Sequence, residues 1–495
     1  MKRLLGLALA AVLITGVMPA SAESYQSYTY NAYDEPVYAP DMYITSEVYN
    51  GGSLGIGDLN QPTDLICGKD GFLYLTDSKN NRIVKISDEL KTEKVFDSFK
   101  QGQNTLTLSS PTNVFVTGDG TLYISDNGNR RVIICDAAGN VEKVLEKPES
   151  ELFPQEKEFL PMDLVVTSTG VLYVLCDGIY QGAVVFDENN EFSGFYGSNT
   201  VEASFKVIAD YFWKKIATKE QRSKMSRYVP VQYSALAIDS EDFVYAAVSA
   251  TDDPSARIRK LNPLGNNILT GTDGRTLSFG DSSSYTYGGA TYSTAFESVT
   301  VGDTMFAALD RTDGKVFVYS QDGDLLSVFG STGNYKGCFT DAVAVTFLGD
   351  SLLVLDAKKG DITRFEMTDY GVVLLKALEV YTDGRYEESL ELWQEVLKYS
   401  SSSYLANLGY GKALYQIGEY REAMECFEQA NDKQRYSEAY KMYRNNIIRE
   451  NFVWFAAGAV LIIILLAVCI KLSLFSKAFC FIKGKIKLGK ERKQV

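Results

Sequence analysis

The chain has 495 residues, of which 49 are basic and 63 are acidic, so its formal net charge at pH 7 is −14. It contains no histidine, which excludes Ser-His-Asp and Cys-His nucleophilic catalysis and every metal site that needs an imidazole ligand. None of the seven cysteines has a paired spacing, and Cys67, Cys135 and Cys176 stand at strand positions. We therefore expect buried thiols and no disulfide framework.

The N-terminal segment has the pattern of an export signal. Lys2 and Arg3 precede an apolar run over residues 4–17, and a small-x-small sequence ends at Ala22. This pattern predicts a signal peptide over residues 1–22. The tyrosine-rich residues 23–39 that follow are interpreted as a linker.

A short motif occurs twice at a fixed spacing and indicates a repeat architecture. It joins an aspartate, an asparagine and an arginine, in the triplets Asp77, Asn80, Arg82 and Asp126, Asn129, Arg131. Strand-like alternation surrounds both copies, and four weaker copies follow, each with short Val-, Ile- and Tyr-rich segments between turns. The pattern predicts a mainly β fold, a six-bladed β-propeller over residues 40–368. These motifs resemble NHL repeats.

Closure of the ring and the role of the motif also follow from the pattern. Residues 42–49 read as a lone outer strand that pairs with the last blade and removes an exposed sheet edge. Asp77 ends one strand and Arg82 begins the next, so the two side chains can pair and order the turn. Two later copies of the motif retain the aspartate, as Asp310 and Asp356, but lack the arginine. We therefore interpret these residues as framework, with a ligand contact as the alternative.

Polar residues recur where the innermost strand of each blade begins, and these starts should converge on one mouth of the channel. The set is Asp64, Asn113, Asp163, Glu297 and Asp341. A ring of oxygen ligands could hold Ca²⁺ or a polar ligand. The arrangement is similar to that of six-bladed lactone-hydrolysing enzymes, the gluconolactonase and paraoxonase group, although Ala235 interrupts the ring. Solvated acids are the remaining alternative.

The connection between blades three and four is long. Residues 199–227 are predicted to include a helix with an apolar stripe that contains Phe205, Ile208 and Phe212. This insert is either a lid or docking helix at one face of the propeller, or a segment packed against neighbouring blades.

Over residues 369–450, the spacing of the recurring residues becomes that of a helical repeat. Gly384, Tyr386 and Trp393 recur at one constant offset as Gly418, Tyr420 and Phe427. This offset equals the tetratricopeptide period, and the segment resembles a tetratricopeptide pair. The resemblance implies helices that bind a protein partner, with Trp393, Tyr420 and Phe427 as their marker residues; the alternative is a rigid stalk.

The C-terminal end predicts a membrane anchor. Residues 452–470 are 19 consecutive residues without a charge, long enough at about 1.5 Å per residue to cross a hydrocarbon core of about 30 Å. The tail at 471–495 carries eight basic residues and one acid. The positive-inside rule places this tail in the cytoplasm and the preceding domains outside.

Charge also limits the partners. Without the ten basic residues and one acid of the two ends, 39 basic and 62 acidic residues remain. A surface this acidic is a poor partner for nucleic acid.

The domain combination resembles envelope proteins of Gram-positive, Clostridia-like anaerobes. This resemblance implies an association with carbohydrate ABC-transport systems. The leading hypothesis is a membrane-tethered extracytoplasmic binding or scaffold protein with a partner in the cell envelope, and no catalytic residue is assigned. The alternatives are a metal-dependent, gluconolactonase-like hydrolase and a purely mechanical spacer.

Overall fold

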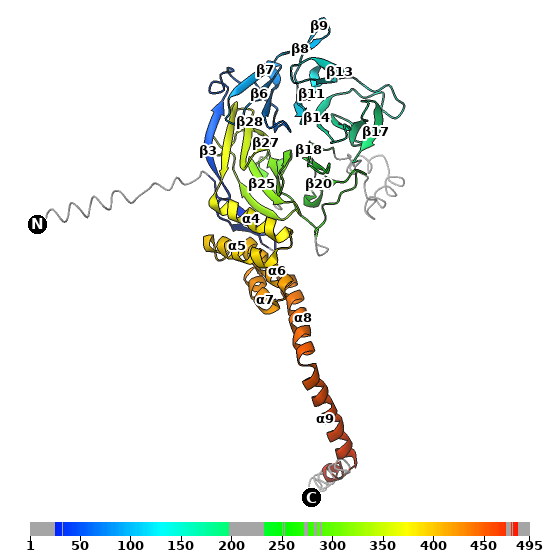
Figure 1. Ribbon diagram of the computed structural model, residues 1–495, viewed down its shortest axis with the longest axis vertical. Helices are drawn as coiled ribbons and strands as arrows, with labels where there is room; N and C mark the ends of the chain where they lie inside the picture. The colour runs from blue at the N-terminus through cyan, green and yellow to red at the C-terminus, as the bar shows by residue number, and fades with distance from the viewer. Residues whose placement is uncertain are drawn as a thin grey trace, which may run out of the picture.

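The structure is a computed structural model that describes residues 25–197 and 232–471, apart from residues 32, 250, 252, 272–275, 282–284 and 288–289, together with residues 477 and 479–483. Within this part of the chain, six β-sheet blades surround a common axis, and helices leave the rim of the ring (Figure 1). The predicted fold class is confirmed. The predicted signal peptide at 1–22 and the predicted insert at 199–227 lie outside the described residues.

The first three blades are four-stranded antiparallel sheets, as the alternating segments between turns predict. Blade one contains β4 (Asp64–Cys67), β5 (Leu73–Asp77), β6 (Arg82–Ile86) and β7 (Thr92–Phe96). Blade two contains β10 (Asn113–Val116), β11 (Leu122–Asp126), β12 (Arg131–Cys135) and β13 (Val141–Leu145). Blade three contains β14 (Pro161–Val166), β15 (Leu172–Cys176), β16 (Ala183–Phe186) and β17 (Phe192–Tyr196). A hairpin of β8 (Ser98–Gln101) and β9 (Asn104–Thr107) projects beside blades one and two (Figure 1).

The last three blades differ in their outer strands. Blade four contains β18 (Ala235–Ile238), β19 (Val244–Ala247) and β20 (Ile258–Leu261), and the hairpin of β21 (Tyr285–Tyr287) and β22 (Ala290–Tyr292) follows it. Blade five begins with β23 (Phe296–Val301), β24 (Met305–Asp310), β25 (Lys315–Ser320) and β26 (Leu325–Phe329). Blade six is built from β27 (Ala342–Leu348), β28 (Ser351–Asp356) and β29 (Asp361–Met367), with β3 (Tyr43–Asn50) as its outer strand.

The ring is closed by strands from its two ends. Strand β3 pairs antiparallel with β29, so that Tyr49 lies opposite Ile362 and Tyr43 lies opposite Met367. The predicted closing strand is thereby confirmed. This pairing covers the outer edge of blade six and joins the beginning of the propeller sequence to its end.

Hydroxyl groups connect neighbouring inner strands at one end of the channel. Thr63 Oγ1 donates to the carbonyl oxygen of Thr112 at 2.9 Å, and Thr112 Oγ1 donates to that of Pro161 at 3.0 Å. Further around the ring, Ser234 Oγ donates to the carbonyl oxygen of Phe296 at 2.6 Å. These bonds set the spacing of the strand starts that line the channel mouth.

The aspartate of the repeated motif organises each turn from a buried position. Asp77 accepts hydrogen bonds from the Asn60 amide at 2.8 Å, from Asn80 Nδ2 at 2.7 Å and from Arg82 Nε at 2.8 Å. Asp126 repeats this arrangement in blade two with the Ser109 amide, Asn129 and Arg131. Each acid therefore holds the chain segment that leads into the inner strand of its own blade.

Two later blades keep this function of the acid without the arginine. Asp310 accepts from the Ala295 amide at 3.0 Å, and Asp356 accepts from the Thr340 amide at 2.6 Å. Both side chains are fully buried, and burial raises the pKa of Asp310 to about 6. The shared bond from acid to incoming amide supports the framework interpretation of the motif.

The tyrosine-rich segment is more than a linker, which corrects the sequence interpretation of residues 23–39. Strands β1 (Tyr28–Tyr30) and β2 (Pro36–Tyr38) form a hairpin, and β1 pairs with β26. Blade five therefore has six strands in the order β2-β1-β26-β25-β24-β23. The residue alternation in β1 is that of a strand, but its partner strand belongs to blade five, far along the chain.

Helices follow blade six directly. They are α4 (Asp369–Thr382), α5 (Tyr386–Tyr399), α6 (Tyr404–Ile417), α7 (Tyr420–Gln429), α8 (Lys433–Glu450) and α9 (Phe452–Lys471). Thr368 and Ser403 cap α4 and α6 through side-chain bonds to the amides of Gly371 and Ala406. Gly418 ends α6 with a φ of 92°, in the left-handed region.

The aromatic residues of the helical repeat fill the space between helices. Trp393 of α5 is 1% exposed, and a Cβ on Gly409 of α6 would lie 2.4 Å from its ring. Phe427 of α7 is 2% exposed and packs against Gly411 of α6 in the same way. Because they are buried, Trp393 and Phe427 cannot themselves contact a partner. Tyr420 is partly exposed.

The helical repeat shares one apolar core with the propeller. Trp393, Leu405 and Ala406 belong to the same buried cluster as Leu326 and Phe329 of blade five. Lys412 Nζ of α6 and Asp324 Oδ2 at the start of β26 form an ion pair of 3.2 Å. The helices are thus fixed to the rim, and the picture of a stalk that only separates the propeller from the membrane is incomplete.

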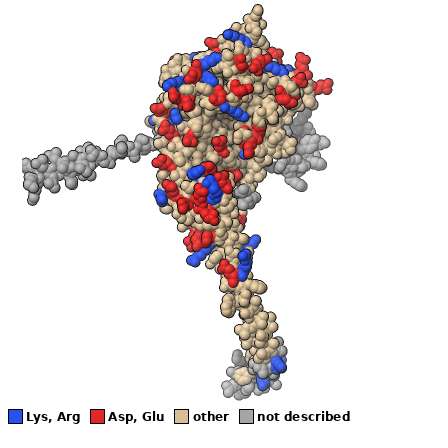
Figure 2. Space-filling model, in the orientation of Figure 1, with Lys and Arg blue, Asp and Glu red and all other residues tan. Residues whose placement is uncertain are grey.

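Within the described residues, one helix has the length and composition of a membrane span. Residues Phe452–Cys469 of α9 have a mean hydropathy of 2.9, and none of this window is buried. Helix α8 leads into α9 at the narrow end of the molecule (Figure 1). Charged side chains cover the propeller and become scarce along α9 (Figure 2). The helix is compatible with a single-pass membrane anchor.

Replacement of Asp77 by alanine is expected to lower the free energy of unfolding by about 2–4 kcal/mol. The change removes the acceptor of three hydrogen bonds and leaves Arg82 without its ion-pair partner. Denaturant unfolding of the full chain in detergent measures the effect, with Asp88→Ala at an exposed position as control. Equal stability of the two variants would contradict a framework role.

Candidate functional site

The strand starts of the propeller surround one cavity. Its volume is about 690 Å³, and its wall includes all five polar residues that the sequence singles out. These are Asp64, Asn113, Asp163, Glu297 and Asp341. The rest of the wall is largely apolar, with Phe115, Val165, Ile238, Val299 and Val345 among its members. The cavity thus has a polar end and an apolar body.

Two acids and an amide occupy one side of the polar end. Asn113 Nδ2 donates to Asp64 Oδ2 at 2.9 Å. Asp163 accepts from the Leu164 amide at 2.7 Å and from the Leu236 amide at 2.6 Å. Ala235 of blade four brings no polar side chain, and Asp163 of blade three instead reaches across to bind the backbone next to it. Asp163 therefore supplies a polar contact at Ala235, where the ring of polar side chains is interrupted.

Burial changes the protonation of these acids. It raises the pKa of Asp163 to about 7. Burial also raises the pKa of Asp64 well above its usual range, and the charge of Asp163 adds to this effect. Near neutral pH this side of the cavity therefore carries less negative charge than two ordinary carboxylates. A protonated carboxyl group can also donate a hydrogen bond to a ligand.

An arginine that the sequence interpretation missed occupies the other side. Arg311 Nε donates to Asp341 Oδ1 at 2.7 Å, and its Nη2 donates to Asp341 Oδ2 at 3.1 Å. Arg311 Nη1 donates to Glu297 Oε1 at 3.1 Å. One guanidinium group thus binds both Glu297 and Asp341 and offsets one of their two negative charges. The pKa of Arg311 is raised, first by its hydrogen bond to Asp341.

A sequence signal for Arg311 does exist. The residue directly follows Asp310, the framework acid of blade five, and the corresponding positions in blades one and two are Ser78 and Asn127. A charged residue at this repeat position stands at the turn next to the strand starts. Its contact with Asp341, however, crosses to blade six and depends on how the two blades pack.

The donor set does not fit Ca²⁺. This cation prefers six to eight oxygen ligands, whereas two of the five predicted residues already bind Arg311. Among the described residues, no group of three or more Asp, Glu or Cys side chains could hold a metal ion. Cys67 also lines the cavity, but burial raises the pKa of its thiol, so it lacks the character of a thiolate nucleophile.

One polar atom in this site lacks a partner. Asn113 Oδ1 is buried, and no hydrogen-bond donor among the described residues reaches it. A buried acceptor without a partner costs about 1–3 kcal/mol. Because this atom has almost no exposed surface, a ligand hydroxyl or amide group would reach it only after the Asn113 side chain moved. The arrangement favours a neutral molecule that both donates and accepts hydrogen bonds.

Comparison with known proteins agrees with the two-part architecture. The tetratricopeptide repeat family matches residues 381–447. No curated protein matches the chain. The helical part is therefore of the tetratricopeptide type, and the fold as a whole is a β-propeller joined to such helices.

Solved structures of low similarity each cover about two thirds of this chain. A virginiamycin B lyase from Staphylococcus aureus is 10% identical, with 65% of this chain and 99% of that chain covered and a TM-score of 0.39. A streptogramin B lyase is 10% identical, covering 66% and 100%, with a TM-score of 0.40. A protein described as a candidate gluconolactonase is 14% identical, covering 66% and 93%, with a TM-score of 0.37. At these values the likeness says nothing about the chemistry of this chain.

The stability of the protein is expected to depend on the protonation of Asp163. Its pKa of about 7 in the folded chain exceeds the unfolded value of about 3.9, so the folded state binds the proton more tightly. The stabilisation from this proton is complete below about pH 4 and is lost as the pH rises through about 7.

Replacement of Asp163 by asparagine removes this titration and keeps an acceptor for the Leu236 amide. Melting temperatures of the wild type and of Asp163→Asn, measured from pH 4 to pH 9, should therefore diverge. The melting temperature of the variant should rise relative to that of the wild type between pH 4 and pH 8. Above pH 8 the difference between the two should stay constant. A pH-independent difference would show that Asp163 has an ordinary pKa.

Proposed function

We propose that this chain is a membrane-tethered, extracytoplasmic binding scaffold whose propeller binds a neutral, hydroxyl-rich ligand, such as a carbohydrate-related molecule. The observation that carries the proposal is the polar end of the channel cavity. There Asn113 lies on the same wall as Asp64 and Asp163, and its buried Oδ1 has no partner among the described residues. Raised pKa values at both acids reduce the negative charge that a neutral ligand would otherwise meet.

The ion pairs on the other side of the cavity support the same ligand class. Arg311 is bound to Glu297 and Asp341, so an ion that bound any of these three groups would have to compete with an ion pair already formed. A polyol can instead share hydrogen bonds with these groups without a change in net charge. The apolar wall suits the C–H faces of a sugar ring. Among the described residues, no group of side chains that could hold a metal ion supports the lactonase alternative.

Attachment to a membrane completes the proposal. Helix α9 would cross the bilayer, with the basic residues 471–495 in the cytoplasm and the propeller outside, as the positive-inside rule predicts. The signal peptide at 1–22 would direct export. Because the helical repeat is packed on the propeller, its outer helices α5 and α7 are the surface that would meet an envelope partner. The resemblance of the domain combination makes a carbohydrate transport system the first candidate.

The channel site is tested by Asn113→Leu, which removes both the unpaired acceptor and the donor to Asp64. The affinity for a neutral saccharide should fall about two- to tenfold, because a hydrogen bond contributes about 0.5–1.5 kcal/mol. Isothermal calorimetry of the full chain in detergent, across a panel of neutral mono- and disaccharides, provides the measurement. Asn104→Leu on the projecting hairpin is the control, because Asn104 is exposed and does not line the cavity. Saccharide binding that survives Asn113→Leu would place the ligand elsewhere.

The partner surface is tested by charge reversal on α5. Glu391 and Glu395 are exposed acids on this helix, and their replacement by lysine should reduce crosslinking of the full chain to its envelope partner in native membranes by about half or more. Glu93→Lys, at an exposed position of β7, is the matched control and should leave crosslinking unchanged. Recovery of the same products from all three chains would remove α5 from the interface.

A further inference from the structure

The N-terminal hairpin lies in a groove at the rim of the ring. We define the strap as residues 25–38, which contain β1 and β2. Tyr28, Thr29 and Tyr30 of β1 pair with residues of β2, whereas only Tyr28 has an aligned partner on β26, Val328. The backbone therefore contributes little to the hold of the strap on blade five, and its side chains must contribute most of it.

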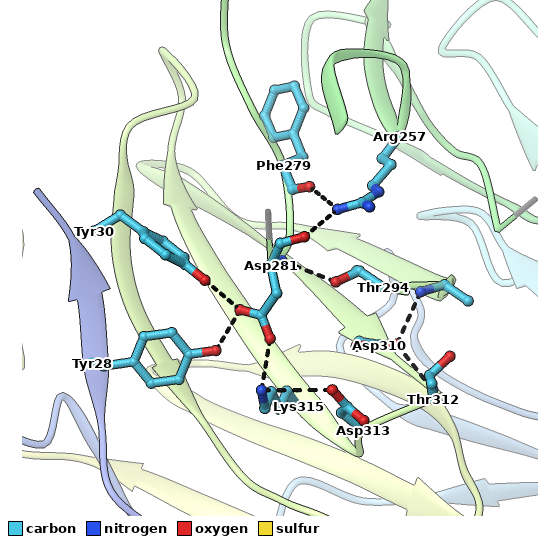
Figure 3. A network of polar contacts seen from close by, with 11 residues as sticks. Tyr28, Tyr30, Arg257, Phe279, Asp281, Thr294, Asp310, Thr312, Asp313 and Lys315 are labelled. Carbon is cyan, nitrogen blue, oxygen red and sulfur yellow. Dashed lines mark hydrogen bonds and ion pairs between the residues drawn. The ribbon is translucent and has the colours of Figure 1, made fainter. Parts of the chain in front are cut away.

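Those side chains converge on one buried acid. Asp281 Oδ1 accepts hydrogen bonds from the hydroxyl groups of Tyr28 at 2.5 Å and Tyr30 at 2.8 Å (Figure 3). Lys315 Nζ binds Asp281 Oδ2 at 2.6 Å and lies 5.5 Å from the centre of the Tyr28 ring. Burial and the Asp281 charge raise the pKa of Tyr28, which keeps its hydroxyl protonated as a donor. The Asp281 carboxylate thus binds both hydroxyl groups of the Tyr-x-Tyr sequence, and the Lys315 ammonium group contacts the ring of its first tyrosine.

The receiving groups are held in place by the propeller itself. The Asp281 amide donates to Thr294 Oγ1 at 2.9 Å, and the Asp281 carbonyl oxygen accepts from Arg257 Nη1 at 2.8 Å (Figure 3). Asp313 lies 3.7 Å from Lys315 Nζ and also offsets its charge. None of these contacts involves the strap. The groove therefore keeps its Asp281–Lys315 pair whether or not the strap is present.

The helical repeat provides the second wall of this groove. A cavity of about 340 Å³ lies between the strap, blade five and α6. Tyr30, Asn31 and Asp34 line it from the strap, and Tyr404 and Leu405 line it from α6. At the turn of the hairpin, Lys433 Nζ of α8 lies 5.7 Å from the centre of the Tyr33 ring. The strap thus bridges propeller and helices and leaves space beside it.

The fit of the strap is incomplete. Ser27 and Ser327 are buried on either side of the seam, and within the described residues neither hydroxyl group has a hydrogen-bond partner. Each such group costs about 1–3 kcal/mol. Tyr33 and Tyr38 are 46% and 61% exposed, so two of the five tyrosines of the strap make limited contact. A segment with these imperfections can be displaced by a better-fitting one.

We propose that this groove is a peptide-acceptor site that the strap occupies in cis, and that its partner is an extended polypeptide segment with a Tyr-x-Tyr sequence. The partner would lie beside β26 as the strap does, place its two tyrosine hydroxyl groups on Asp281 and fill the cavity against α6. The strap is then an intramolecular competitor that keeps the site closed. This site is independent of the channel cavity and of any saccharide bound there.

The experiment uses the full chain in detergent and a fluorescent peptide with the sequence of residues 25–38. Anisotropy measures binding of this peptide to the wild type, to Tyr28→Phe/Tyr30→Phe and to a chain that lacks residues 25–38. The double variant weakens the cis strap but leaves the receiving groups intact. Peptide binding should therefore rise at least about tenfold over the wild type, and it should rise further in the deleted chain.

The same substitution has the opposite effect in the peptide. A peptide with phenylalanine at both tyrosine positions should bind the deleted chain about tenfold more weakly, and Asp281→Asn in that chain should weaken the unmodified peptide similarly. The melting temperature reports whether each chain is folded. If the deleted chain does not fold, the double variant decides. A folded double variant that binds no more peptide than the wild type overturns the proposal and leaves the hairpin as a structural cover of the β26 edge.

Discussion

Strand β3 lies beside β29 in blade six, and this antiparallel pairing joins the beginning of the propeller to its end. The closed ring is the constraint on which the other features depend. Only closure brings the inner strands of blades one, three, five and six to one axis, so that Asp64, Asp163, Glu297 and Asp341 share a cavity. Closure also fixes the rim where blades five and six receive the helices. The pairing supplies the hydrogen bonds that the outer edge of β29 would otherwise leave to solvent.

The buried aspartates of the repeated motif stabilise the individual blades of the closed ring. In four blades an acid at the end of the second strand accepts the amide of the segment before the first strand. This local bond can be expected from the repeated sequence, because donor and acceptor belong to the same repeat and are close in the chain. The channel acids differ in that their partners come from other blades, as in the bond from the Leu236 amide to Asp163. Their protonation therefore depends on blade packing.

The helical repeat and the strap both make contacts with distant segments that their local sequence patterns do not predict. The spacing of Trp393 and Phe427 predicts a tetratricopeptide pair, and the family match over residues 381–447 agrees. The spacing carries no information about the docking of α6 on blade five, which removes part of the repeat surface from solvent. Likewise, the tyrosine-rich residues 23–39 resemble a linker because their strand partner, β26, belongs to blade five and is remote in the sequence.

The sequence by itself determined the mainly β propeller, its closing strand, the helical pair and the apolar C-terminal helix. It could do so because turns, strand alternation and helical periods are local and repeat at fixed spacing. It also placed five polar residues at the strand starts that line the cavity. Only the tertiary structure decided that Arg311 pairs with Glu297 and Asp341, that Asp163 binds the backbone beside Ala235, and that Asp281 binds the strap. These outcomes depend on distances and burial between segments far apart in the chain, which no local pattern specifies.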